Sequence, residues 1–298
     1  MNTPTPIKSR SRRWIVGITV LAVAIAAGLW WWQGGALPPD NGATGSSAAP
    51  ADPETAQTAV VAAHADQAPW RQFAATHPVL LVVTDADWPW AERQRAVNDL
   101  ATAALTPELL AACFDYLRSP VPAEEKPAML ERAIRNDLLN VLRTRTDETL
   151  ALVPVLAEQA ADPAQDSALR DYALQHLATW APRLPEAEQQ LAVETLCDTL
   201  KAREASYAGT ALLGLYDMSN RETRTVSLPG LDLPAEAIRI ATDKSMGLHS
   251  RIGALALCQQ MQVASDDLVA LALNWQTDST LPEPARRAAS AYLSQRSR

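Results

Sequence analysis

The chain contains 298 residues, with 26 basic and 34 acidic side chains and a formal net charge of −8. A hydrophobic content of 48% supplies enough apolar surface for a folded core, so a wholly disordered protein is excluded. Three cysteines are too few to staple a small disulfide-rich domain. The acidic balance argues against general nucleic-acid binding, because that function needs a cationic surface to neutralise phosphates.

The N-terminal region is predicted to contain one transmembrane helix at residues 14–32. This stretch reads WIVGITVLAVAIAAGLWWW and carries no charged side chain. A helix of about 20 residues crosses a bilayer core of about 30 Å. Indole rings favour the membrane–water interfaces, and tryptophans stand at both ends of the stretch, at Trp14, Trp30, Trp31 and Trp32.

The charges that flank this helix predict its orientation. Residues 1–13 form a tail with no acidic residue and four basic ones, and the next basic residue after the helix is Arg71. The four cations of the tail are Lys8, Arg10, Arg12 and Arg13. The positive-inside rule then places the N-terminus in the cytoplasm. We therefore expect a single-pass protein of a bacterial inner membrane with a periplasmic C-terminal domain.

A cleaved signal peptide is the alternative interpretation of the same region. Ala24 and Ala26 supply a small-residue cleavage site after a short apolar segment. The apolar stretch continues to Trp32, however, so cleavage would leave a hydrophobic mature terminus. This favours an uncleaved anchor.

Residues 33–69 are predicted to form a flexible linker. Up to residue 57 small and polar residues dominate, and Leu37 is the only large apolar side chain. So little apolar surface cannot offset the chain entropy that folding removes. Residues 58–69 form a transition to the folded region.

Residues 70–298 are predicted to be nearly all α-helical. The region is rich in Ala and Leu, its apolar residues recur three and four positions apart, and Pro punctuates it. The single strand signal is the β-branched run Val79–Val83.

A helix-pair pattern recurs along this region. The clearest copy has an apolar helix at 150–160, an Asp-Pro turn at 162–163, and a second helix that reads Leu-Arg-x-x-Ala-x-x-x-Leu from Leu169 to Leu177. Six alanines stand at the equivalent position, 37, 40, 38, 43 and 35 residues apart. These marker alanines are Ala96, Ala133, Ala173, Ala211, Ala254 and Ala289. Small side chains at this position permit close approach of neighbouring helices.

The pattern resembles HEAT repeats, whose helix pairs recur about every 40 residues. The resemblance covers residues 88–298 and implies an all-α, HEAT-like solenoid of about six helix pairs. The copy at Ala133 is imperfect, because Asp137 follows it where an apolar residue is expected; Ile134 with Leu138 would shift that stripe by one. An irregular helical bundle is the alternative fold.

The resemblance also implies a role. HEAT-type arrays are usually protein-binding scaffolds, and stacked pairs offer an extended surface rather than a deep cleft. We therefore expect no catalytic residue, no metal, no cofactor and no small-molecule substrate. The expected partners are other envelope or membrane proteins.

A pair of aspartates suggests a metal-dependent enzyme as an alternative function. Asp85 and Asp87 follow the run Val79–Val83, and a carboxylate pair after a strand can hold Mg²⁺. The competing interpretation is that Asp87 caps a helix that begins at Trp88, with Pro89 in its first turn.

The histidines and cysteines are interpreted as structural residues. The four histidines have no metal-ligand spacing, and His176 falls between core positions of a predicted second helix. The three cysteines, Cys113, Cys197 and Cys258, are widely spaced in helical patterns, as small buried residues would be. A disulfide between two of them is left open.

The segment 220–234 is the candidate partner-binding site. It is long for a helix–helix connection, and long loops on rigid repeats often carry recognition. The residues assigned to binding are Arg221, Arg224, Leu228, Leu231 and Leu233. The alternative is a packed connector whose leucines cover a groove.

The sequence thus predicts a membrane-anchored extracytoplasmic scaffold or an accessory subunit of an envelope complex. A single-pass sensor or regulator is a further alternative. The identity of the partner, the pathway, the oligomeric state and cleavage of the N-terminal helix are not predicted.

Overall fold

The computed structural model describes residues 69–202, 207–220, 228 and 230–296, all within the unit Thr58–Arg298. The described residues form fourteen α-helices and one 3-10 helix, with no strand among them. The protein is therefore an all-α helical-repeat protein over this part of the chain.

The predicted anchor lies outside the described residues. This applies to the tail with Arg10, Arg12 and Arg13, to the tryptophan-flanked stretch 14–32, and to the linker up to residue 68. Among the helices that the structure describes, none is both long and apolar enough to cross a bilayer. The anchor, the linker and the domain boundaries remain predictions.

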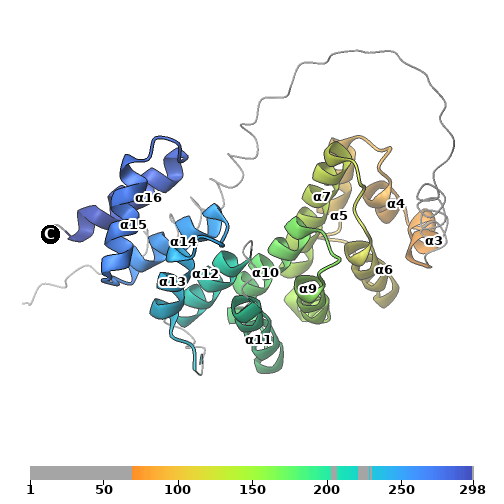
Figure 1. Cartoon of the computed structure of the whole chain (residues 1–298). Helices are drawn as coiled ribbons and strands as arrows, with labels where there is room; N and C mark the ends of the chain where they lie inside the picture. Colours follow the sequence, from red (N-terminus) through yellow and green to blue (C-terminus); the bar gives the residue numbers. More distant parts are fainter. Residues whose placement is uncertain (1–68, 203–206, 221–227, 229, 297–298) are drawn as a thin grey trace, which may run out of the picture. The chain divides into compact units, whose positions relative to one another are not determined.

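The helices follow one another in chain order (Figure 1). Their bounds are α3 Pro69–Thr76, α4 Pro78–Thr84, α5 Trp90–Asp99, α6 Pro107–Arg118, α7 Glu125–Thr144, α8 Thr146–Thr149, α9 Leu152–Ala161, α10 Ser167–Trp180, η1 Ala181–Arg183, α11 Glu186–Ala202, α12 Ala208–Ser219, α13 Leu233–Thr242, α14 Leu248–Gln260, α15 Asp266–Thr277 and α16 Glu283–Arg296.

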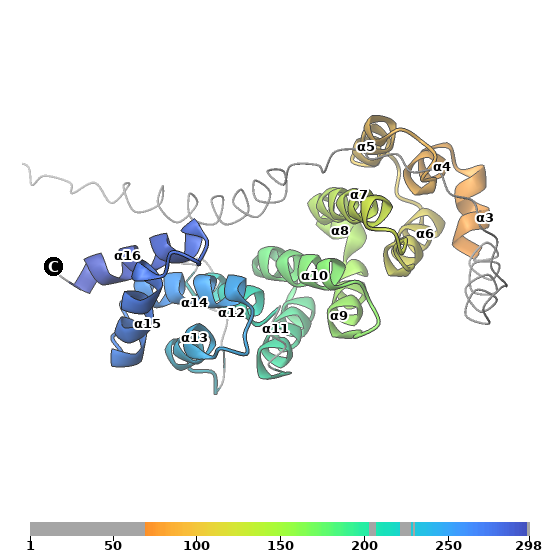
Figure 2. The same cartoon turned by 45° about the horizontal axis from the view of Figure 1, so that its top comes forward.

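Twelve of these helices form six consecutive pairs in two layers. The two helices pack closely on each other in five of the pairs, whereas α6 and α7 are joined mainly through Arg135 of α7, which bonds the carbonyls at the end of α6. The second helices α5, α7, α10, α12, α14 and α16 pack against one another in that order (Figure 2). The first helices are α4, α6, α9, α11, α13 and α15; α9 packs on α6 and α11, and α13 packs on α15. Short loops join most of the pairs, so the two helices of such a pair run antiparallel. α3 packs on α4 and α6 at the start of the array.

All six marker alanines lie in second helices, as the repeat predicts. Ala173, Ala211, Ala254 and Ala289 are completely buried, and Ala96 is nearly so. The exception is the copy in α7, where Ala133 is only half-buried. There Ile134 and Leu138 are completely buried, so the apolar stripe is shifted by one residue. The shift moves Asp137 away from the core.

The strand signal at Val79–Val83 was wrong, because these residues form helix α4. Pro78 occupies the first turn, and the His77 ring accepts a hydrogen bond from the Leu80 amide. Leu80 and Val83 are both completely buried on the face that meets its neighbours. Since no neighbouring strand offers backbone partners in the described region, packing decides the conformation over β-propensity.

Four first helices end at an aspartate that closes a turn. In each case the aspartate is the C-cap residue, and its Oδ1 accepts a hydrogen bond from the amide two residues on, at 2.8–2.9 Å. These residues are Asp85 after α4, Asp162 after α9, Asp243 after α13 and Asp278 after α15. Such turns satisfy backbone groups where the chain leaves the helix.

An arginine follows each of these aspartates eight residues later. Arg93, Arg170 and Arg251 each donate from Nε to the carbonyl ten residues back, at 2.9, 3.0 and 3.0 Å. The acceptors lie at the C-terminal ends of α4, α9 and α13, where carbonyls lack helical partners and the dipole favours a cation. The fourth arginine, Arg286, makes a longer bond of 3.4 Å to the Ser279 carbonyl. We call this Asp-x7-Arg pattern the turn signature.

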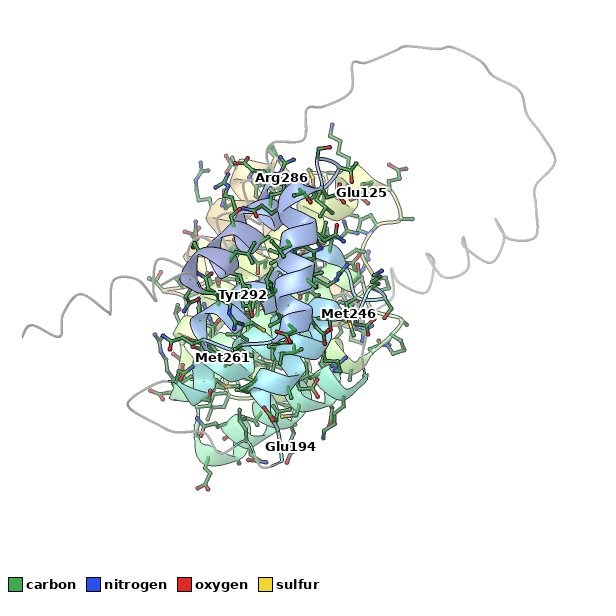
Figure 3. The ribbon with its side chains drawn as sticks, turned by 60° about the vertical axis from the view of Figure 1, so that its left-hand side comes forward. Glu125, Glu194, Met246, Met261, Arg286 and Tyr292 are labelled. Carbon is green, nitrogen blue, oxygen red and sulfur yellow. The ribbon has the colours of Figure 1, made fainter. Side chains whose placement is uncertain are left out.

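Two arginines of the turn signature, and Arg135 of α7, also lie over aromatic rings. The guanidinium carbon of Arg170 lies 4.5 Å from the ring centre of Tyr207, and that of Arg251 lies 5.1 Å from Trp275. Arg135 covers Tyr116 at 4.8 Å. Each contact is a cation–π interaction, and the first two join one helix pair to the next. In the C-terminal pair, the hydroxyl of Tyr292 on α16, labelled in Figure 3, donates to the Val263 carbonyl at 3.0 Å.

The first two pairs share a buried ionic network. Glu131 of α7 accepts from Arg93 at 2.7 Å and from Arg135 at 3.2 Å, and all three side chains are at least 92% buried. Burial alone would raise the pKa of Glu131, but Arg135 and Arg93 outweigh it and hold that pKa below its ordinary value. The Tyr116 hydroxyl accepts from Arg93 at 3.1 Å, and burial raises the pKa of this phenol.

Candidate partner-binding surface

The second helices present a row of uncharged polar side chains. In the repeat register, Asn98 of α5 and Gln175 of α10 lie five residues after the arginine of the turn signature, and both are exposed. Asn136 and Asn140 lie on the corresponding face of α7. Because α5, α7 and α10 pack in series, these amides belong to one surface. We call this surface the second-helix face; it continues onto α12 through Thr210.

Hydrogen bonds join neighbouring second helices along this face. Gln94 of α5 donates to Asp137 of α7 at 3.4 Å, and Thr210 of α12 donates to Asp171 of α10 at 2.6 Å. Between α7 and α10, the His176 Nε2 lies 3.0 Å from the Asn136 amide oxygen. These bonds fix the relative positions of the helices that carry the exposed amides.

Small residues allow α12 to pack closely against both of its neighbouring second helices, α10 and α14. A Cβ placed on Gly214 of α12 would lie 2.5 Å from the Ala178 Cβ of α10. A Cβ placed on Gly209 would lie 2.6 Å from the Ser250 Cα of α14. Only glycine therefore fits at these two positions, and α12 is held tightly on both sides.

Two carboxylates on the face have raised pKa values. Burial is the main cause at both Asp137 and Asp171, and the hydrogen bonds that Asp171 accepts from Thr210 and Gln175 counteract it only in part. The charge of His249 also acts to lower the pKa of Asp171, without offsetting the effect of burial. By contrast, Asp166 pairs with Arg132 at 2.8 Å, which lowers its pKa against the effect of burial. The face is thus weakly acidic and rich in hydrogen-bonding groups.

His176 has a structural role on this face. Its ring is buried, and burial lowers its pKa to about 3, with a smaller contribution from Arg143. The imidazole is therefore neutral at physiological pH. Over the described residues, no three His, Cys, Asp or Glu side chains gather closely enough to hold a metal ion.

The acidic pair at the end of α4 serves the backbone. The Asp85 carboxylate accepts from the Asp87 amide at 2.9 Å and so closes the turn. The expectation that Asp87 caps the next helix was wrong: α5 begins at Trp90, its N-cap residue is Pro89, and no side chain caps it. The physical reason is that the Asp87 amide is part of the turn that Asp85 closes, and Trp88 and Pro89 separate the exposed Asp87 from the start of α5.

The cysteines are free thiols. Cys113 and Cys258 are completely buried in α6 and α14, as expected for small core residues. Burial raises both pKa values to about 12, which keeps them as unreactive thiols. Cys197 of α11 is half-buried.

The predicted binding segment is described only in part. Arg221 and Arg224 lie outside the described residues. Leu228, Leu231 and Leu233 are half-buried and pack against the hydrophobic core. Their assignment to partner binding remains a prediction.

Leu231 also lines a small pocket between α11 and α13. The pocket has a volume of about 170 Å³, and among the described residues it is also lined by Leu200, Lys201, Glu236 and Arg239. This is well below the roughly 300–1,000 Å³ of a site for a drug-sized ligand. It has room for one side chain.

Comparisons with known proteins leave the family open. No protein-family model matches the chain, and no curated protein matches it. Among solved structures, a designed armadillo repeat protein is similar at 14% sequence identity and a TM-score of 0.36, over 72% of this chain and 98% of that one. A likeness this low carries no further conclusion, and the description of the fold rests on the helix contacts given above.

Proposed function

We propose that the protein is a membrane-anchored, extracytoplasmic scaffold that binds other envelope proteins through its second-helix face. The observation that carries the proposal is the unbroken series of contacts among the second helices, which gathers exposed amides from several repeats on one surface. Serial stacking of this kind gives extended binding surfaces. The two-helix unit with its period of about 40 residues supports a HEAT-like type of repeat.

The chemistry of the face supports a polypeptide partner. Side-chain amides both donate and accept hydrogen bonds, so a row of them suits the alternating N–H and C=O groups of a peptide backbone. Asp137 and Asp171 place two carboxylates on the same face, where they bond to Gln94, Thr210 and Gln175, and this acidic character favours a partner with basic side chains.

The location rests on the sequence of residues 1–32. An uncharged 19-residue stretch, tryptophans at both of its ends and a basic tail before it together favour a single inner-membrane anchor with the repeat domain in the periplasm. Protease added to spheroplasts should degrade a C-terminal tag on the full-length protein. Protection of the tag in intact spheroplasts, with degradation only after lysis, would contradict this topology.

Two matched substitutions test the scaffold role. Gln175 on the second-helix face bonds Asp171 four residues earlier, and Gln190 on the exposed side of α11 bonds Glu194 four residues later. Both are exposed amides with the same kind of helical partner. We expect Gln175→Arg to reduce the amount of co-purified partner about tenfold after crosslinking in cells, and Gln190→Arg to leave it unchanged.

The outcome separates the scaffold from its alternatives. Equal loss of partner with both variants, or no stoichiometric partner for the unmodified protein, would contradict the role of the face. For the alternative of an enzyme that uses Asp85 and Asp87, we note that Asp85 closes the same kind of turn as three other aspartates of the array, which supports a structural role for this carboxylate.

A further inference from the structure

The pocket between α11 and α13 lies at a discontinuity in the first-helix layer. α9 packs against α11, and α13 packs against α15, whereas α11 and α13 do not pack closely on each other. One long hydrogen bond, from Arg239 Nη2 to the Leu200 carbonyl at 3.4 Å, joins the two helices beside the pocket. A gap of this kind can admit a side chain without disrupting a packed core.

The guanidinium of Arg239 is paired on its Nε/Nη2 edge, whereas its Nη1/Nη2 edge has only one long hydrogen bond among the described residues. Its Nε donates to a carboxylate oxygen of Glu236 at 2.7 Å, and its Nη2 forms an ion pair with the same oxygen at 2.7 Å. On the other edge, Nη2 makes only the long bond to Leu200, and Nη1 is buried without an acceptor among the described residues. A buried donor without an acceptor is unfavourable, so this edge is suited to a bidentate carboxylate.

The other lining residues of the pocket indicate which chemical groups the ligand carries besides the carboxylate. Leu200 and Leu231 supply apolar walls, and Glu236 is the one acidic lining residue among those described, already paired with Arg239. Lys201 adds a second cation whose own pair with Asp198 is exposed and therefore weak. The volume of about 170 Å³ is close to that of a cavity of about 150 Å³ that holds one benzene molecule. An apolar side chain and a carboxylate must therefore share one residue.

We propose that this pocket binds the C-terminal residue of a partner polypeptide, with its apolar side chain between Leu200 and Leu231 and its terminal carboxylate on Arg239. A chain terminus is the one peptide element that carries a carboxylate and an apolar side chain on the same Cα atom. Capture of a terminal carboxylate is a known mode of peptide recognition. The inference rests on the proposed binding role but concerns a different surface from the second-helix face.

The test uses the full-length protein in detergent and a pair of photoreactive probes. These are N-acetyl-photo-leucine, which has a free carboxylate, and its amide. After irradiation, mass spectrometry locates the labelled residues. We expect the acid to label peptides containing Leu200 or Leu231 saturably, and at least about tenfold more than the amide, as the loss of a charge-assisted bidentate contact implies.

Variants assign the preference to the pocket cations. Arg239→Gln should remove the preference for the acid, and Lys201→Gln should reduce it about two- to threefold. The control is Arg287→Gln on α16, which removes a cation from an exposed ion pair with Glu283 and should change nothing. Excess inorganic phosphate should compete less well than N-acetyl-leucine, because it has no side chain for the apolar walls.

Several results would overturn the proposal. They are equal labelling by acid and amide, absence of labelling at the pocket, or a preference that survives Arg239→Gln. Because Lys201 is exposed, Lys201→Gln tests the same point if Arg239→Gln fails to fold. Failure of these experiments would leave the second-helix face untouched, since the probes do not depend on the crosslinked partner.

Discussion

An arginine caps the C-terminal end of the first helix in all six helix pairs, but four pairs place this arginine at one sequence spacing and two pairs do not. The carbonyls at the end of a first helix lack helical partners, and a cation there also complements the dipole. In the four pairs with the turn signature, an arginine of the second helix lies eight residues after the aspartate, as Arg170 does after Asp162. In α6/α7, Arg135 takes this role by bonding the Ser119 and Pro120 carbonyls, and in α11/α12 the Leu200 carbonyl is reached by Arg239 of the next pair.

The comparison shows that an arginine caps the first helix in every pair. The distance in sequence between this arginine and the end of the helix is constant in only four of the pairs. Where the loop has a constant length, one short pattern recurs. Where the connection is longer, as in α6/α7, the arginine comes from elsewhere on the second helix and needs Glu131 to neutralise it inside the core. The α6/α7 pair, together with Arg93 of α4/α5, should therefore depend on the buried charge of Glu131. The capping arginines Arg170 and Arg251 should depend on hydrogen bonds and cation–π contacts.

The largest effect is expected from Glu131→Ala. Removing this carboxylate leaves Arg93 and Arg135 buried without their counterion, which costs about 3–5 kcal/mol. The control Glu148→Ala removes the exposed partner of Arg145 and should cost about 0–1 kcal/mol. Denaturant unfolding followed by circular dichroism gives the loss, and hydrogen exchange should localise it to α4–α7. Similar costs for the two variants would contradict the distinction.

Acidic pH should destabilise the α6/α7 pair, because Glu131 loses its charge there. The pKa of Glu131 is lower in the folded protein than in the unfolded chain, so its contribution is complete above the unfolded value of about 4.3. As the pH falls through the folded pKa, the contribution disappears. The protection factors of the α7 amides, which compare observed with intrinsic exchange, should therefore fall below about pH 4 in the natural protein. In Glu131→Gln, which cannot titrate there, this fall should be smaller.

The next effect concerns a single arginine of the turn signature. Arg170→Met removes a buried charged donor to the Ala160 carbonyl and the stack on Tyr207, and should cost about 1.5–3 kcal/mol. Arg286→Met removes a longer bond at the more exposed C-terminal pair and should stay within about 0.5 kcal/mol. Thermal unfolding of the two variants measures the difference, and the reverse ranking would sink this account of the capping arginines.

A smaller effect on stability is expected from alanine substitutions at two glycines, one destabilising and the other neutral or stabilising. Gly214→Ala places a Cβ 2.5 Å from that of Ala178, and overpacking of about 1–3 kcal/mol should exceed the gain of about 1 kcal/mol in helix propensity. Gly253→Ala meets the Leu213 side chain only at 3.4 Å and should be neutral or stabilising. Adding Ala178→Gly should rescue Gly214→Ala. Absence of rescue would show that the seam between α10 and α12 is not the cause.

The smallest effect is expected from Asp171→Asn. Burial raises the pKa of Asp171, so the charged form opposes folding at neutral pH, and stability returns as the pH falls through the raised pKa. Asparagine keeps an acceptor for Thr210 without the charge. The melting temperature of Asp171→Asn should therefore exceed that of the natural protein at pH 7. The difference should vanish below about pH 3.9, where the unfolded carboxyl is also protonated.

The helical repeat was predictable because its signal is periodic. The marker alanines recur at the length of one helix pair, and close packing of second helices requires a small residue there. The turn signature is also visible in the sequence, since Asp85, Asp162, Asp243 and Asp278 all precede an arginine by eight residues. Because Asp85 is one of this set, the shared spacing is the signal that could have assigned it to a turn rather than to a metal site.

Other features depend on three-dimensional contacts and have no local signal. Glu131 and Arg93 are 38 residues apart, and nothing near either residue indicates that they meet in the core. The run Val79–Val83 has strand propensity, but the packing of Leu80 and Val83 decides for a helix. The pocket at Arg239 arises because α11 and α13 do not pack closely on each other, which a repeat pattern does not reveal.

The role of the second-helix face can be tested most directly by site-specific photocrosslinking in living cells. A photoreactive amino acid is placed at residue 140 or 175 on the face, or at residue 190 on the exposed side of α11, in the full-length protein. We predict that positions 140 and 175 crosslink to the same envelope protein in stoichiometric yield, and that position 190 does not. Crosslinks from position 190 alone, or from all three positions equally, would contradict the central claim that the second-helix face is the docking surface.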